Sequence, residues 1–176
     1  MRLFYALVPP EREKLQILVQ QDKLRSIAQS GRFTPSENLH MTLQFLGEIP
    51  QERLKALKEI LTMAARTAEP FSLTLDAYGW FSGKGQERLW YLTGNSPEAT
   101  QLSCVLGQLL VENGFSVEDR ALVPHITLSR RCRLRNDAVL EPLTPITIPV
   151  QRLWLMESRQ IRGSAVYVPV HHGALG

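Results

Sequence analysis

The fold is indicated by the stretch LHMTLQFL at residues 39–46 and by the similar stretch VPHITLS at residues 123–129. Apolar and polar residues alternate in the first stretch, which is typical of a half-buried β-strand. The expected core face consists of Leu39, Met41, Leu43 and Phe45. Because residues two apart in a strand share a face, His40, Thr42 and Gln44 are expected on the opposite, polar face.

The second stretch repeats the essential pair. His125 and Thr127 are again two residues apart, and leucine again follows the threonine, as Leu43 in the first stretch and Leu128 in the second. A short motif of this kind has a known false-positive risk, but its repetition with the same neighbour lowers that risk. Each strand is therefore expected to present an imidazole beside a hydroxyl.

The same order of elements precedes both stretches. A strand and a helix are expected at residues 2–8 and 11–29 before the first stretch, and at 88–93 and 97–113 before the second. Tyr5 precedes His40 by 35 residues, and Tyr91 precedes His125 by 34. This echo predicts a single domain over residues 1–176, made of two similar α+β lobes whose motif strands face one cleft across a pseudo-two-fold axis.

Local signals set the expected limits of the helices. The apolar stripe of the first helix is expected to be Leu15, Leu18, Val19 and Ile27. Gly31 is a suitable residue to end this helix, and Ser96 with Pro97 is a suitable start for the helix at 97–113. The other expected elements are a helix at 51–66, a strand at 71–75, a Gly-rich turn at 82–85, strands at 146–156 and 164–170, and a loop or short helix at 131–142.

The composition is that of one globular domain. Of 176 residues, 44% are hydrophobic and 21% are charged, and the net charge of +3 is too small for a protein that coats DNA. Two cysteines are too few for a disulfide framework. The opening MRLFYALVPP is too short for a signal peptide, and no apolar run reaches the roughly 18 residues of a membrane span. We therefore expect a soluble, cytoplasmic monomer that does not enter a membrane.

Two imidazoles with unperturbed pKa values near 6.5 suit shared acid and base roles near neutral pH. Two neighbouring hydroxyls can donate hydrogen bonds to the oxygens of a phosphoryl group, and this set needs no metal. Other interpretations stay open, since histidines on strands also serve as structural residues or metal ligands. Neither motif contains a carboxylate or cysteine to complete a metal site, so we expect no metal and no cofactor.

Arginines surround the second motif, as Arg130, Arg131, Arg133 and Arg135. For most of them we expect a solvated surface. Arg130 is a candidate for RNA binding, but strand alternation places it opposite His125 and Thr127 unless a bulge intervenes. The aromatic residues Phe45, Trp80, Trp90 and Tyr91 are expected mainly in the core, with one of them available to stack on a base. His171 and His172 are expected in a solvated tail.

With these residues in view, the chain resembles the two-histidine phosphoesterase superfamily, and within it the RNA 2′,3′-cyclic phosphodiesterases, also called 2′-5′ RNA ligases. The resemblance rests mainly on ENLHMTLQFLGE at 37–48 and PHITLSR at 124–130. RLFYAL at 2–7 and the closing stretch LWLMESRQIRGSAVYVPV, with Ser158 and Tyr167, support it.

The resemblance implies an α+β fold of two antiparallel sheets with outer helices around a central cleft. It also implies hydrolysis of a 2′,3′-cyclic phosphate to a 2′-phosphomonoester without a metal. His40 would protonate the leaving 3′ oxygen, His125 would activate water, and Thr42 and Thr127 would hold the phosphate. Joining of tRNA halves through a 2′-5′ linkage is a further implied activity.

We therefore expect an enzyme acting on RNA with a 2′,3′-cyclic phosphate end or on a small cyclic nucleotide. Two alternatives stay open at this point. One is a non-catalytic module that binds RNA ends, and the other is a two-histidine phosphoesterase for a different cyclic nucleotide or nucleotide-sugar phosphate.

Overall fold

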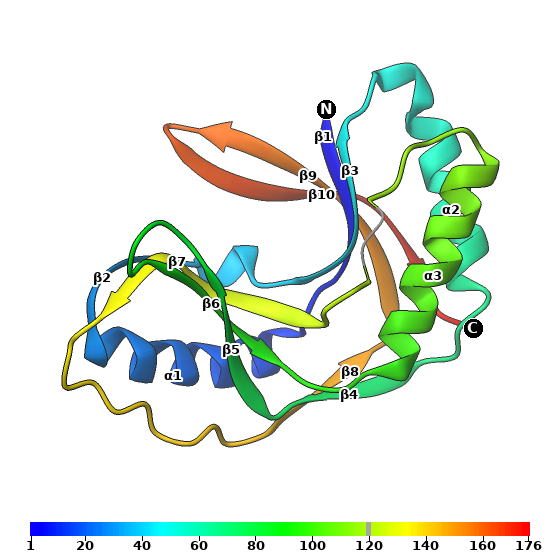
Figure 1. Cartoon of the computed structure of the whole chain (residues 1–176). Coiled ribbons are helices and arrows are strands. Elements are labelled where there is room, and N and C mark those ends of the chain that lie inside the picture. Colours follow the sequence, from blue (N-terminus) through cyan, green and yellow to red (C-terminus); the bar gives the residue numbers. More distant parts are fainter. Residues whose placement is uncertain (119–120) are drawn as a thin grey trace.

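A computed structural model describes residues 1–118 and 121–176 of the chain (Figure 1). In this part, the elements follow in the order β1 (Arg2–Leu7), α1 (Glu11–Ile27), β2 (Ala28–Phe33), η1 (Ser36–Asn38), β3 (Met41–Glu48), η2 (Gln51–Arg53), α2 (Leu54–Ala65), β4 (Phe71–Leu75), β5 (Ala77–Ser82), β6 (Arg88–Thr93), α3 (Pro97–Glu112), β7 (His125–Leu134), β8 (Ile146–Val150), β9 (Arg152–Ile161) and β10 (Ser164–Ala174). The expected strand and helix before each histidine motif are therefore confirmed.

The strands form two four-stranded sheets and one two-stranded sheet. The first sheet has the order β10-β9-β1-β3, the second has the order β2-β7-β6-β5, and β4 pairs with β8. All of these strand pairs are antiparallel. The expected α+β class with two antiparallel sheets is confirmed, although the small third sheet was not predicted. The motif strands β3 and β7 lie beside β1 and β6 respectively, and they contact each other between the sheets.

Two of the helices, α1 and α3, pack on the sheet that does not contain the strand before them. α1 follows β1 in the chain but packs against β2 and β7 of the second sheet, whereas α3 follows β6 but packs against β3 of the first. α2 lies beside α3 and contacts β9 and β10 (Figure 1). One large apolar cluster fills the space between helices and sheets, and it includes Met41 and Leu43 of β3 and Ile126 and Leu128 of β7. The opposite faces of both motif strands are thus left for the histidines and threonines.

A bulge interrupts the expected alternation in β3. Thr42 lies opposite Ala6, but Gln44 lies opposite Tyr5, so Leu43 is an extra residue in the ladder. As a result, the Gln44 amide points to the helix side and donates to the backbone oxygen of Ser103 at 3.0 Å. Phe45 instead packs with the small apolar cluster on the motif face. The prediction that Phe45 belongs to the core face and Gln44 to the motif face was therefore wrong.

β7 has the same irregularity at the same place. Thr127 lies opposite Tyr91, and the next paired residue is Ser129 opposite Trp90, so Leu128 is skipped. Ser129 is fully buried, and Arg130 is exposed. The bulge that Arg130 needs in order to share a face with the second motif is therefore present.

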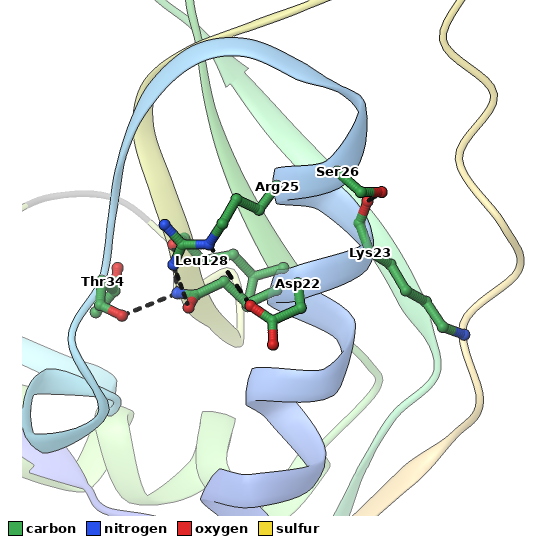
Figure 2. Close-up of polar contacts among 7 residues, drawn as sticks. Asp22, Lys23, Arg25, Ser26, Thr34 and Leu128 are labelled. Atoms are coloured by element: carbon green, nitrogen blue, oxygen red, sulfur yellow. Dashed lines mark hydrogen bonds and ion pairs between the residues drawn. The ribbon is translucent and has the colours of Figure 1, made fainter.

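The buried face of α1 differs from the predicted stripe. Leu15 and Val19 are 64% and 55% exposed, whereas Ile17 and Leu24 are fully buried. The other buried residues of this helix are polar or charged, namely Glu13, Lys14 and the two glutamines Gln20 and Gln21. The side-chain amide of Gln21 donates to the backbone oxygens of Thr34 and Leu128. Figure 2 shows these two residues beside the last turns of the helix. Because these glutamines are polar, the apolar periodicity of the sequence could not identify this face.

The structure also corrects several limits. Gly31 lies inside β2 and does not end α1, which stops at Ile27. A Cβ at Gly31 would lie 3.2 Å from that of Cys132, so glycine lets β2 approach β7 closely. The strand β2 was missed because its residues are polar and mostly exposed, and β5 was also missed. The expected start of α3 is confirmed, since the backbone N–H of Ala99 donates to the Ser96 hydroxyl at 3.3 Å.

Near the C-terminus, the predicted strand at 146–156 is two strands, β8 and β9, separated by Gln151. The segment 131–142 is neither wholly loop nor helix, because β7 continues to Leu134. His171 and His172 belong to β10 and not to a tail, although His172 is exposed. Among the described residues, no helix is long and apolar enough to cross a membrane.

Candidate active site

The imidazole of His40 is fixed on both of its nitrogens. Its Nδ1 lies 2.7 Å from the backbone oxygen of Asn38, and its Nε2 lies 3.0 Å from Oγ1 of Thr42. Because a carbonyl oxygen can only accept, Nδ1 carries the proton in the neutral ring. The Nε2 lone pair then accepts from the Thr42 hydroxyl, so the first His–Thr pair is joined directly.

The second histidine has the same anchor. Nδ1 of His125 lies 2.7 Å from the backbone oxygen of Val123, again two residues earlier in the chain. The loop before it is held by Thr93, whose hydroxyl donates to the backbone oxygen of Pro124 at 2.6 Å. In both motifs, Nδ1 is the nitrogen that bonds to the backbone, so Nε2 is the candidate atom for proton transfer.

The side chains of the two motifs lie close enough to interact electrostatically. Burial lowers the pKa of His40 to about 4, against a smaller raising effect of its bond to Asn38. The positive charges of His125 and Arg130 lower this pKa further. These charges reach His40 because β3 and β7 contact each other between the sheets. In the ligand-free protein, His40 is therefore neutral at neutral pH, and a negative charge would relieve the positive surroundings.

Each imidazole packs against a pair of aromatic rings that also contact each other. The rings of Phe4 and Tyr167 are both 4.9 Å from that of His40, the latter edge-on. Around His125, the ring of Tyr91 lies at 5.1 Å and that of Phe81 at 5.5 Å. These rings cover part of each imidazole and reduce its contact with water.

Sequence reasoning found only part of this aromatic lining. Tyr91 had been assigned mainly to the core, Tyr167 was known only from the family resemblance, and Phe4 and Phe81 were missed. A Cβ at Gly79 would lie 2.3 Å from the Tyr91 ring, so glycine in β5 provides the space for that ring. Because the strand that contains Gly79 was not predicted, its pairing with Tyr91 could not be recognised from the sequence.

Asn38 connects the first motif to the last strand of the sheet. Its side-chain amide donates to the backbone oxygen of Ala165 at 2.7 Å, and its Oδ1 accepts from the backbone N–H of Tyr167 at 3.1 Å. Its own backbone oxygen accepts from His40. Asn38 is buried, and it thus positions both His40 and the aromatic ring beside it. This residue was not among those predicted from the sequence.

A cavity of about 440 Å³ adjoins the first motif and shares the Tyr167 wall. Its apolar walls include Val8, Trp154 and Met156, and its charged lining residues are Glu11, Lys14 and Glu37. This volume falls within the range of about 300–1,000 Å³ that is usual for small-molecule sites. Among the described residues, no three His, Cys, Asp or Glu side chains gather closely enough to hold a metal ion.

Comparisons with known proteins agree with this geometry. Residues 8–91 match the family model described as LigT like Phosphoesterase. The chain is 34% identical over 137 residues to the RNA 2′,3′-cyclic phosphodiesterase of Thermus thermophilus, covering 74% of this chain and 69% of that protein. It is 32% identical to the RNA 2′,3′-cyclic phosphodiesterase of Escherichia coli, covering 99% and 96% of the two chains.

Solved structures give the same result. The crystal structure of E. coli LigT complexed with 3′-AMP superimposes with a TM-score of 0.82 at 30% identity, covering 99% of this chain and 97% of that one. The crystal structure of TT0787 from T. thermophilus superimposes with a TM-score of 0.84 at 29% identity, covering 99% and 98%. By sequence and by structure, the chain belongs to the LigT-like phosphoesterase family of two-histidine phosphoesterases.

Proposed function

We propose that this protein is an RNA 2′,3′-cyclic phosphodiesterase, which hydrolyses the cyclic phosphate at an RNA end to a 2′-phosphomonoester. The observation that carries the proposal is the pair of His–Thr motifs on adjoining strands, each with its imidazole anchored through Nδ1. The relatives at about 30% identity that bear this activity in their names support it. The E. coli structure with 3′-AMP supports a nucleotide ligand in particular.

In the proposed reaction, Nε2 of His125 removes a proton from a water molecule whose oxygen attacks the phosphorus. The bond from phosphorus to the 3′ oxygen breaks, and its electron pair goes to that oxygen, which receives a proton from Nε2 of His40. The hydroxyls of Thr42 and Thr127 donate to the non-bridging oxygens, where negative charge accumulates. Arg130 is proposed to attract the phosphate or the adjoining RNA through its charge.

The lowered pKa of His40 puts a condition on this assignment. An acid must be protonated when it acts, but burial and nearby positive charge keep His40 neutral in the free protein. A bound phosphate brings an opposite charge beside the ring and raises its pKa. Substrate binding is therefore proposed to load the proton onto His40, which keeps this histidine from acting as an acid before substrate is present.

We also propose that the two sheets form two similar lobes of one domain, which works as a monomer in the cytoplasm. Joining of tRNA halves would use the same residues, with a ribose hydroxyl in place of water. His125 would take the proton of that hydroxyl, whose oxygen attacks the phosphorus, and His40 would again protonate the leaving 3′ oxygen.

The proposal is tested with a 2′,3′-cyclic mononucleotide and an oligoribonucleotide that ends in a 2′,3′-cyclic phosphate. The protein should hydrolyse both, and His40→Ala and His125→Ala should each lose most of the turnover while the far-ultraviolet circular dichroism spectrum is retained. Turnover that survives in either variant would remove that histidine from the mechanism. Binding of RNA ends without turnover would favour the non-catalytic module, and preference for a nucleotide-sugar cyclic phosphate would favour a different phosphoesterase.

A further inference from the structure

Four arginines gather on the edge of the second sheet, beyond the second motif. They are Arg32 of β2 and Arg130, Arg131 and Arg133 of β7, and we call them the arginine track. All four are exposed. A chain whose net charge is only +3 therefore has a local concentration of positive charge, and this concentration begins in the strand that carries His125.

Strand pairing brings β2 and β7, which carry these arginines, side by side. Arg32 lies directly opposite Arg130, and Ser30 lies opposite Arg133. Like charges placed directly opposite each other destabilise a sheet. Among the described residues, none of the four arginines forms an ion pair with a carboxylate, and the one side-chain bond formed is from Arg133 to the amide oxygen of Gln86. An anion supplied from outside would remove the repulsion.

The backbone of β7 is irregular along the track. Cys132 is fully buried, whereas Arg131 and Arg133 on either side of it are exposed. Arg131 has a φ of 50°, a left-handed conformation that is unfavourable for a residue with a side chain. This conformation and the close approach at Gly31 accommodate the irregular pairing that brings β2 beside β7.

The track is continuous with the candidate active site. The charge of Arg130 lowers the pKa of His40, so the track begins within electrostatic reach of the reacting group. Arg133 follows His125 by eight residues in the same strand, which corresponds to a span of about 26 Å or less. The four arginines lie in the far part of this span, from Arg130 to Arg133, and several positive groups side by side fit a chain of phosphates better than a single one.

We propose that the arginine track binds the phosphodiester backbone of the RNA strand that leads to the cyclic phosphate, so that the protein prefers an oligoribonucleotide to a cyclic mononucleotide. This inference rests on the proposed function and adds to it the length of the preferred substrate. The ligand is single-stranded RNA, because side chains on an open sheet edge can follow a flexible backbone and leave the terminal nucleotide free to enter the site.

The test compares kcat/KM for a 2′,3′-cyclic mononucleotide and for a ten-nucleotide RNA ending in the same cyclic phosphate, at several salt concentrations. Each phosphate contact on single-stranded RNA contributes a slope of about −0.7 in a plot of log affinity against log salt. Three additional contacts would make the slope for the oligonucleotide steeper by about 2, which is a roughly 16-fold greater loss of kcat/KM between about 50 and 200 mM salt.

Arg32→Gln and Arg133→Gln should each make this slope about 0.7 less steep and reduce the preference for the oligonucleotide over the mononucleotide. Arg66→Gln is the matched control, because Arg66 is an exposed arginine at the end of α2, which packs on the other sheet. This variant should match the wild type for both substrates. Equal salt slopes for the two substrates, or an unchanged slope in both track variants, would overturn the inference.

A second readout separates this inference from the proposed function. Fluorescence anisotropy with a labelled ten-nucleotide RNA bearing a 3′-terminal phosphate measures binding without turnover. If the wild type hydrolyses neither cyclic phosphate, the proposed function fails, but the salt slopes of binding for the wild type and the track variants still decide whether the track binds RNA.

Discussion

The burial of His40 makes a prediction about stability that does not depend on any substrate. The pKa of this imidazole falls from its ordinary value of 6.5 to about 4 in the folded protein. Between these two values, the unfolded chain binds a proton and the folded chain does not. The contribution of neutral His40 to folding is therefore fully present above about pH 6.5 and is lost as the pH falls toward 4.

The size of the effect follows from the shift. Each pKa unit corresponds to about 1.36 kcal/mol, so a shift from 6.5 to about 4 corresponds to at most about 3 kcal/mol. With a urea slope of about 2 kcal/mol per molar, this energy corresponds to a change in unfolding midpoint of about 1.5 M. A surface histidine would give almost no change.

Urea unfolding of the wild type and of His40→Gln at several pH values measures this contribution. Glutamine does not titrate, so the difference between the two midpoints isolates the proton bound by His40 from the titration of all other groups. We expect the wild type to lose stability relative to His40→Gln as the pH is lowered from about 7 to about 4. Parallel curves for the two proteins would show that the imidazole is not desolvated, and the account of its surroundings would be wrong.

Four further outcomes are expected. Thr42→Ala and Thr127→Ala should each lower kcat about ten- to a thousand-fold by removing one donor to the phosphate, and wild-type kcat in either variant would exclude that donor. Asn38→Ala should cost about 1–3 kcal/mol in urea unfolding, since it leaves two backbone groups of β10 without their partner, and it should also lower kcat; an unchanged midpoint would contradict this. Gly79→Ala should cost about 1–3 kcal/mol in thermal unfolding and lower kcat by displacing the aromatic ring packed on it, and normal stability would show that the ring can move freely. The pH profile of kcat/KM should be bell-shaped, because one histidine must be protonated and the other neutral, whereas a flat profile would contradict paired acid and base roles.

The two motif strands were predictable because apolar and polar residues alternate over the residues around His40 and His125. Met41 and Leu43 had to be buried, so His40 and Thr42 had to share the other face. The position of the bulges was not predictable, because register is decided by the partner strand and not by the strand's own pattern. This is why the faces of Phe45 and Gln44 were exchanged, and why the position of Arg130 depended on a bulge.

Other errors have a similar cause. The inner face of α1 includes Gln20 and Gln21, whose burial is permitted by hydrogen bonds to other elements, and no periodicity of apolar residues reveals such partners. β2 is held by backbone pairing with β7, so its exposed polar side chains gave no signal of a strand. Asn38 acts through backbone groups of β10, which lie 127 and 129 residues away in sequence.

The most direct test of the central claim is the identity of the product end. An oligoribonucleotide with a 2′,3′-cyclic phosphate is incubated with the protein and excess chelator, and the terminal phosphate is located by phosphorus NMR or by resistance to a 3′-specific phosphatase. The proposed roles of His40 and His125 predict turnover in chelator and a 2′-phosphate product, because the 3′ oxygen is the leaving group. A 3′-phosphate product, or turnover that stops when metal is removed, would contradict the account.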